Sequence, residues 1–473
     1  MDITSSELAC VISRTLYRFQ YFFPMRLRVR KAILLSANCS PKTQDTIPFR
    51  LKNQWYCPAD KNHMLTSFRV LSNRSFRLFL TVQTLSVMGS WMQLTALGWL
   101  LYRLSGSAYI VAILVFLNQI PVLLLSPVAG SLADRLDRRR LLLCTQSTSF
   151  AVTLSLAAAV LLHKTDVFWL LSLVAASGIV YALDLPARQS FLCDLVGKEQ
   201  LRYAIILNSL SFHLARMLGP LFAGILISSV GESWCIFLNS FSFLAVALTL
   251  LWMKKDLHHH NEPIKDHATG VMHGLYYVWK QPALSRILLL LSIVSFLGAQ
   301  HSTFIPVLTR QNFHEQAKGL GLLMGAPGIG ALAAALMLLF RSSNNRLGSL
   351  LPAMTAGSGV ALVLLAWSNH MWVAEILLIV LGFCITFQNA ASNILLQEDA
   401  PEWIRGRIMA LFSMAFMGLM PVGAFALGFA TRHARVSTVL TVAGMTCAIV
   451  TLVVESLFRA NIKPSSKIAA PAN

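Results

Sequence analysis

Long apolar runs alternate with short polar segments along most of the chain, from residue 78 to residue 458. The length of each run is close to that of a transmembrane α-helix, which needs about 20 residues to cross the hydrocarbon core of a bilayer. Because lipid offers no partners to backbone N–H and C=O groups, such a run predicts a helix. Twelve runs occur: Leu78–Leu101, Ala108–Leu132, Leu141–Leu162, Val167–Leu183, Tyr203–Val230, Ser233–Met253, Ile287–Thr309, Gly319–Phe340, Leu347–Asn369, Met371–Leu396, Ile408–Thr431 and Val436–Phe458.

A polar gap divides the runs into two sets of six, so we expect an N-terminal extension (1–75), a first half (76–253), a cytoplasmic linker (254–286), a second half (287–458) and a tail (459–473). Within the linker, "GVMHGLYYVWKQP" (270–282) predicts a short amphipathic helix on the membrane surface. The histidines His258, His259, His260 and His267 indicate a solvated linker rather than a metal site, and no metal is expected.

The two halves resemble each other weakly. The segment "FLCDLVGKEQLRYAIILNS" (191–209) is similar to "ILLQEDAPEWIRGRIMALF" (394–412), and both follow the fourth run of a half and open the fifth. Parallel repeats of this kind are a known transporter architecture, with the substrate site between the repeats. The pattern predicts an all-α membrane protein of twelve transmembrane helices in two six-helix pseudo-repeats.

Composition and charge sharpen this picture. The chain is 56% hydrophobic and 12% charged, against about 25% charged residues in soluble domains, which excludes an ordinary soluble protein. The net charge of +19 is unevenly placed: with both termini cytoplasmic, 32 of the 39 Lys and Arg lie on the cytoplasmic side. The external loops hold Arg103, Lys164, Arg310, Lys318, Arg432 and Arg435. The positive-inside rule therefore places both termini in the cytoplasm, and no nucleic-acid partner is needed to explain the charge.

Residues 1–75 do not continue the pattern of the rest of the chain. They are basic, without a clear helical period, and lack the cleavage site of a secretory signal. Two interpretations stay open: a disordered cytoplasmic tail that touches anionic lipid, or a segment that is not native because translation begins at Met64. The second is favoured.

The loop between the second and third runs carries the sequence "GSLADRLDRRR", residues 130–140. With the twelve-helix pattern, this loop resembles the signature of the major facilitator superfamily, roughly Gly-x-Leu-Ala-Asp-Arg-x-Gly-Arg-Arg. Residues Gly130, Leu132, Asp134, Arg135, Arg138 and Arg139 match it, whereas Asp137 stands where the family often has Gly. The resemblance implies that Asp134 lies near the N-terminus of the eleventh helix, in the other half.

We expect Arg138 or Arg139 to reach Asp184, at the cytoplasmic end of the fourth helix. Such a cluster would join the two halves on the cytoplasmic side and break when they rock. The alternative is that four arginines simply hold the loop inside the cell.

Further stretches, including "DLPARQSFLCDLVGKEQL" and "NSLSFHLARMLGPLFAGILI", are similar to the enterobactin-exporter-like branch of this superfamily, with macrolide efflux proteins nearby. The resemblance covers about residues 76–458. It implies export of a small organic molecule by a monomer in the bacterial inner membrane. The expected driving force is an ion gradient, with protons as the coupling ion, and no cofactor is expected.

Polar side chains at helical spacing are the candidates for the transport pathway. In lipid such a stripe favours the bundle interior, although interhelical hydrogen bonding is the equal alternative for any single residue. The resemblance implies that the first, fourth, seventh and tenth helices line the cavity. The candidates there are Gln83, Ser86, Ser90, Gln93, Gln300, His301, Gln388, Asn389 and Asn393.

The fifth helix adds His213 and Arg216, followed by a small-residue motif for tight packing, Ala215, Gly219, Pro220 and Ala223. Arg216 is either a fixed polar clamp between helices or an anion-attracting group on the cavity wall. His213 and His301 are the candidate proton carriers, because no acid lies clearly in mid-membrane.

No phosphate-binding loop, catalytic triad or HExxH motif occurs in the sequence, so we expect a transporter and not an enzyme or an ATP-driven pump. Within that expectation a siderophore-like anion competes with amphipathic drugs such as macrolides. An importer and a non-transporting sensor on the same fold are the remaining alternatives.

Overall fold

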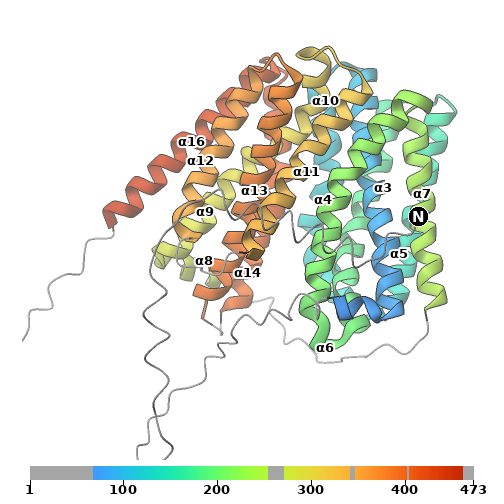
Figure 1. Cartoon of the computed structure of the whole chain (residues 1–473), viewed down its shortest axis with the longest axis horizontal. Coiled ribbons are helices and arrows are strands. Elements are labelled where there is room, and N and C mark those ends of the chain that lie inside the picture. The colour runs from blue at the N-terminus through green and yellow to red at the C-terminus, as the bar shows by residue number, and fades with distance from the viewer. Residues whose placement is uncertain (1–67, 254–270, 341–346, 402–403, 462–473) are drawn as a thin grey trace, which may run out of the picture. The chain divides into compact units, whose positions relative to one another are not determined.

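The computed structural model describes residues 68–253, 271–340, 347–401 and 404–461, which belong to the second of two compact units, residues 61–473. Every regular element in these ranges is a helix (Figure 1). The expected extension up to residue 67, the histidines of the linker and the end of the tail lie outside the described residues, as do the side chains of Asp134 and Arg135.

The first half begins with the short helix η1 and continues with five long helices. Side chains of Asn73, Asp137 and Asp166 accept hydrogen bonds from backbone N–H groups at the starts of three of them. One helix, α6, contains both the fourth and the fifth predicted runs, because the backbone stays helical through the polar segment between them. The elements are η1 (Phe68–Ser72), α3 (Arg74–Ser105), α4 (Ala108–Arg135), α5 (Arg138–Leu161), α6 (Val167–Val230) and α7 (Glu232–Trp252).

The predicted short amphipathic helix is present as α8. The first span of the second half starts earlier than expected, at Pro282 in place of Ile287. Proline is favoured at the first turn of a helix, where its missing N–H costs nothing. The elements are α8 (Val271–Lys280), α9 (Pro282–Phe296), η2 (Gly298–Gln300), α10 (His301–Gln311), α11 (Ala317–Phe340), α12 (Leu347–Ala366), α13 (Met371–Asp399), α14 (Arg405–Ser413), the π-helical turn η3 (Met414–Gly418), α15 (Leu419–Ala430) and α16 (Val436–Asn461).

Two of the predicted continuous spans are interrupted in the structure. The seventh consists of α9 and α10, joined through the 3-10 turn η2, and the eleventh consists of α14 and α15, joined through η3. The side chain of Gln300 bridges the two, because its Nε2 donates to the carbonyl oxygen of Ser295 at 3.0 Å and to that of Met420 at 2.9 Å. One polar side chain thus donates a hydrogen bond to a backbone carbonyl group on each of these two spans.

Eleven segments of the described chain are long and apolar enough to cross a membrane. The remaining predicted span is the first run along the chain, which lies in α3. This helix of 32 residues is not among the eleven, because its polar stripe lowers its mean hydropathy. Its position beside α6 and α7 is that of a bundle helix. The all-α architecture with two sets of six spans is therefore the one that the sequence predicts.

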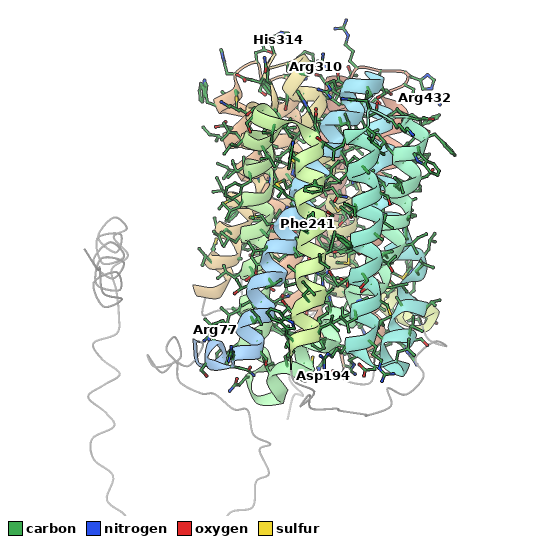
Figure 2. All side chains as sticks on the ribbon, turned by 90° about the vertical axis from the view of Figure 1, so that its right-hand side faces the viewer. Arg77, Asp194, Phe241, Arg310, His314 and Arg432 are labelled. Atoms are coloured by element: carbon green, nitrogen blue, oxygen red, sulfur yellow. The ribbon has the colours of Figure 1, made fainter. Side chains whose placement is uncertain are left out.

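The two ends of the bundle differ in how the halves meet. Figure 2 shows Arg77 and Asp194 at one end, which we call the Asp194 end, and Arg310, His314 and Arg432 at the other, which we call the Arg310 end. At the Arg310 end one apolar cluster combines both halves; it includes Ala96, Trp99, Ile227, Phe304 and Leu320. At the Asp194 end the clusters are separate, one built from the second half alone and two from the first half alone.

Glycines permit the close approach of the halves toward the Arg310 end. A Cβ placed on Gly321 of α11 would lie 2.8 Å from the Cα of Gly224 on α6, so neither position has room for a side chain. On the other side of the bundle, α4 packs against α15 through aromatic rings, with Phe116 and Phe425 centred 5.0 Å apart. These contacts hold the halves together at this end.

Candidate translocation site between the halves

Arg216 lies in the second span of α6, 14 residues before the helix ends at Val230, or about 21 Å along the axis. It is half-buried and has no hydrogen bond or ion pair with any residue in the described part of the chain. The guanidinium lies against an aromatic face, with Cζ 5.2 Å from the ring centroid of Trp91 on α3. Such a contact contributes about 0.5–2 kcal/mol, which leaves the charge without a counterion.

His301 brings the second half to this charge. It opens α10 directly after the break in the seventh span, and the charge of Arg216 acts on it as well as on His213. Its side chain is 1% exposed, with Nδ1 3.3 Å from the carbonyl oxygen of Gly298. The other ring nitrogen, Nε2, is buried and has no partner among the described residues. Two predicted residues of different halves therefore lie within electrostatic reach of each other.

The polar residues of α13 divide into two faces. Gln388 is fully buried, and neither of its amide atoms has a partner within the described ranges. Asn389 and Asn393 are half-buried, and Gln397 donates to the side chain of Asn393. The half-buried face of α13 is the one that can still meet a solute, whereas Gln388 is enclosed by protein.

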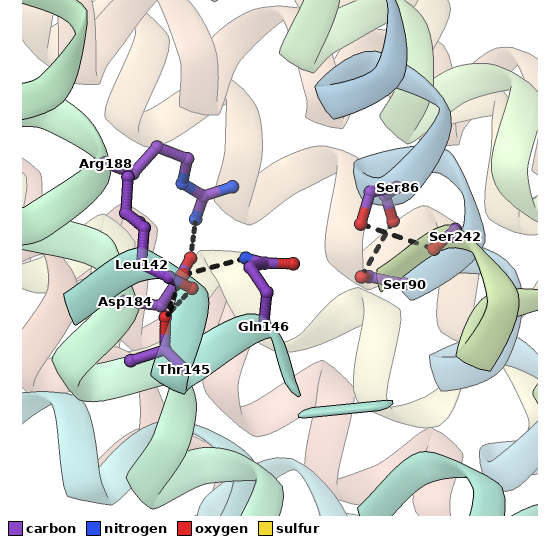
Figure 3. Close-up of polar contacts among 8 residues, drawn as sticks. All are labelled: Ser86, Ser90, Leu142, Thr145, Gln146, Asp184, Arg188 and Ser242. Atoms are coloured by element: carbon purple, nitrogen blue, oxygen red, sulfur yellow. Dashed lines mark hydrogen bonds and ion pairs between the residues drawn. The ribbon is translucent and has the colours of Figure 1, made fainter. Parts of the chain in front are cut away.

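The stripe on α3 is largely occupied by contacts within the first half. Ser242 of α7 donates to the hydroxyl of Ser86 at 3.3 Å, and Asn239 of α7 donates to Oε1 of Gln93 at 2.6 Å. Ser90 donates to the backbone of Ser86, as Figure 3 also shows. The structure thus gives Ser86 and Gln93 the interhelical role that the sequence left open, while Gln83 is buried with an unpartnered Oε1.

The expected pairing of Arg138 or Arg139 with Asp184 is wrong. Arg138 forms an ion pair with Asp194 at 2.6 Å, and Arg139 donates to the carbonyl oxygen of Leu250, at the end of α7. These contacts fasten the start of α5 to α6 and α7, all within the first half. The sequence could not choose between Asp184 and Asp194, because both lie on the same long helix and the choice depends on how α6 bends.

Asp184 has partners of its own (Figure 3). It accepts hydrogen bonds from Thr145 Oγ1 and Gln146 Nε2, both at 2.8 Å, and pairs with Arg188 at 3.3 Å. This residue is only 4% exposed, and the three neighbours from α5 and α6 fix the position of its carboxylate. It is a structural link inside the first half.

The packing motif of the fifth predicted helix makes close contacts on two sides. A Cβ on Gly219 would lie 2.7 Å from the carbonyl oxygen of Met88 on α3, and Ala223 belongs to the cluster that joins the halves. Ala215 and Pro220 are also buried. By contrast, a Cβ on Gly130 would have no heavy atom of the described residues within 4 Å.

Sequence reasoning missed Trp91, the partner of Arg216. The residue stands inside an apolar run with no feature that separates it from the other tryptophans, and only the packing of α3 on α6 at Gly219 brings its ring under the guanidinium. The bridging role of Gln300 was missed for a similar reason, since hydropathy does not record a backbone break inside an apolar run.

Comparisons with known proteins agree with this architecture. The profile of a family described as "Transmembrane secretion effector" matches residues 65–470. The staphyloferrin A transporter of Staphylococcus aureus is 23% identical over 387 residues, covering 80% of this chain and 94% of that protein. The enterobactin exporter EntS of Salmonella typhi is 26% identical, with 64% of this chain and 72% of that protein covered.

The multidrug efflux pump Tap of Mycolicibacterium fortuitum is 23% identical over 71% of this chain and 84% of that protein. Among solved structures, the nucleoside transporter NupG superposes with a TM-score of 0.64 at 12% identity, covering 82% of this chain and 99% of that one. At this identity the superposition shows the fold alone.

Proposed function

The chain belongs to the transmembrane secretion effector family of the major facilitator superfamily, a membrane transporter and not an enzyme, and from this membership we propose that it exports a small organic molecule by alternating access. The observation that carries the proposal is the difference between the two ends. A single apolar cluster joins the halves at the Arg310 end, and separate clusters stand at the Asp194 end. A transporter that is closed on one side and open on the other has this arrangement.

The charge distribution supports a topology that is compatible with the proposed direction of transport. The positive-inside rule places both termini and the Asp194 end in the cytoplasm of a bacterial cell, with the Arg310 end outside the inner membrane. A state open to the cytoplasm is the one that loads a cargo for export. The proposed driving force is the proton gradient, with His213 and His301 as candidate carriers, and the functional unit is a monomer in contact with lipid.

Two cargo classes have support. Relatives named for staphyloferrin A and enterobactin favour a siderophore-like compound. The relative named as a multidrug pump favours an amphipathic drug, and so does an apolar groove of about 510 Å³ between α3, α6 and α7. The unpaired charge of Arg216 favours the first class, because an apolar drug would leave it uncompensated.

The test has two parts. Media from bacteria with and without the protein, grown with and without iron limitation, are compared by untargeted mass spectrometry, and the compound that differs is then measured in everted membrane vesicles. Accumulation inside energised everted vesicles, abolished by a protonophore, is the expected result. Accumulation in right-side-out vesicles instead would identify an importer, and no accumulation in either would identify a non-transporting protein; both contradict the proposal.

A further inference from the structure

We propose that Arg216, Trp91 and His301 bind an organic oxyanion that carries a neighbouring hydroxyl group, and that the transported molecule has this chemistry. The proposal rests on the transport function and adds the recognition site. Nothing in the family match or in the names of the relatives assigns a ligand to these three residues.

The first step is the isolation of the Arg216 charge. A charged side chain deep in a span costs about 2.5–3.5 kcal/mol on insertion scales, and arginine does not escape this cost by releasing its proton. The ion pairs between described side chains use other cations: Asp137, Asp184, Asp194, Glu232 and Glu455 each pair with a different arginine. Arg216 is thus a cation deep in a span for which the described chain supplies no anion.

The second step is the set of donors that this isolation leaves available. A guanidinium offers five N–H donors in a planar fork that matches the two oxygens of a carboxylate. Stacked on Trp91 at 5.2 Å, the Arg216 fork is supported from one side, and none of its donors is used within the described ranges. The residue as a whole is half-buried.

The third step is the acceptor across the interface. With Nδ1–H of His301 directed at the carbonyl oxygen of Gly298, Nε2 of the neutral ring is an acceptor, and it is buried without a partner. A buried polar atom without a partner costs about 1–3 kcal/mol, which a ligand hydroxyl would recover. Donor and acceptor come from opposite halves, so one ligand with both groups would contact both.

The fourth step is the position of the three residues along the bundle. Met92, Phe304 and Ala223 all belong to the apolar cluster that joins the halves. Met92 directly follows Trp91 and Phe304 lies one turn beyond His301, whereas Ala223 lies about two turns beyond Arg216, each toward the Arg310 end. Arg216, Trp91 and His301 therefore stand at the inner edge of the closed region, where a solute that enters from the Asp194 end would stop.

The experiment uses equilibrium binding to the purified full chain, which needs no flux. Three probes of one size separate the requirements: salicylate has a carboxylate and a neighbouring hydroxyl, benzoate has the carboxylate only, and salicylamide has the hydroxyl without the charge. We expect saturable binding of salicylate, about tenfold weaker binding of benzoate, and none of salicylamide. Equal binding of salicylate and benzoate would remove His301 from the site, and absence of saturable salicylate binding would overturn the whole proposal.

Variants identify the residues. Arg216→Gln is expected to weaken salicylate binding at least tenfold, and Trp91→Leu about threefold, with unchanged melting temperature. The matched control is Arg432→Gln, because Arg432 lies 4.8 Å over the ring of Tyr109 in the same kind of contact but at the Arg310 end. Salicylate binding that survives in Arg216→Gln, or falls equally in the control, overturns the assignment.

If Arg216→Gln does not fold, the probe series on the wild-type chain and the Trp91→Leu variant decide the question. The experiments distinguish failure of the proposed binding site from failure of the proposed transport function. A chain that binds salicylate as predicted but accumulates nothing in vesicles contradicts the proposed function and keeps the site. A chain that exports its cargo but does not distinguish the three probes keeps the function and loses the site.

Discussion

The Arg310 end and the Asp194 end of the bundle are built from similar apolar helices, yet only the first is closed. Toward the Arg310 end, glycines on α6 and α11 let the backbones of the two halves touch, and aromatic rings of α4 and α15 pack together. At the Asp194 end the charged groups that the described chain shows are bonded within one half, as Arg138 is to Asp194 and Arg286 to Glu455. These bonds link helices within each half, and the contacts described above between the halves are apolar ones that can separate without leaving a charge unpaired.

The largest loss of stability and flux is expected from placing a larger side chain at the contact between Gly321 and Gly224 in the closed end. In Gly321→Val the new side chain would meet the backbone of Gly224 and Pro220, which cannot move aside, so overpacking should cost about 1–3 kcal/mol and abolish flux. The melting temperature in detergent and flux in everted vesicles measure this. The control is Gly130→Ala, whose Cβ meets open space in this state. A Gly321→Val protein as stable as the control would show that the ends do not differ in this way.

The second effect concerns the charged loop of the open end. We expect Asp134→Asn or Arg138→Ala to abolish flux while the protein still inserts, because the loop is needed when the Asp194 end closes and the closed Arg310 end does not depend on it. Membrane fractionation and vesicle flux check both points. If both variants insert and transport at the wild-type rate, the loop serves only to set topology.

A smaller effect is expected at Arg216, between the two ends. The structure shows no multi-donor clamp, so Arg216→Lys should retain part of the flux and melt like the wild type, whereas Arg216→Ala should lose nearly all flux. Lysine keeps the charge although it lacks the fork. Flux and melting of both variants decide the question: a lysine variant that fails as completely as alanine and melts early would restore the clamp interpretation.

The smallest effect is expected from shortening the chain. The family match begins at residue 65, and the clusters at both ends use residues from Val70 onward. A chain that begins at Met64 should therefore insert and transport like the full chain, within the error of the vesicle assay. Loss of insertion or of flux would give the preceding residues a role.

Hydropathy was enough to predict the spans and the two six-helix sets, because each run must satisfy its backbone internally in lipid. It could not predict the breaks at η2 and η3, since these lie inside runs that stay apolar. The polar candidates were found, but their roles depend on helix rotation: Gln93 faces α7, whereas Trp91, two positions earlier, faces Arg216. Partner choice among charges, as for Arg138, depends on tertiary contacts that one sequence does not contain.

The central claim is that the halves rock, with one end opening as the other closes. Its most direct test is a pair of distance measurements by spin labelling in a background without native cysteines. One label pair spans the halves at the Asp194 end, on Arg77 and Arg405, and the other spans them at the Arg310 end, on Ser105 and Arg432. We predict that adding the exported compound shortens the first distance and lengthens the second in the same fraction of molecules. Distances that stay fixed at both ends, or that shorten together, would contradict alternating access in this chain.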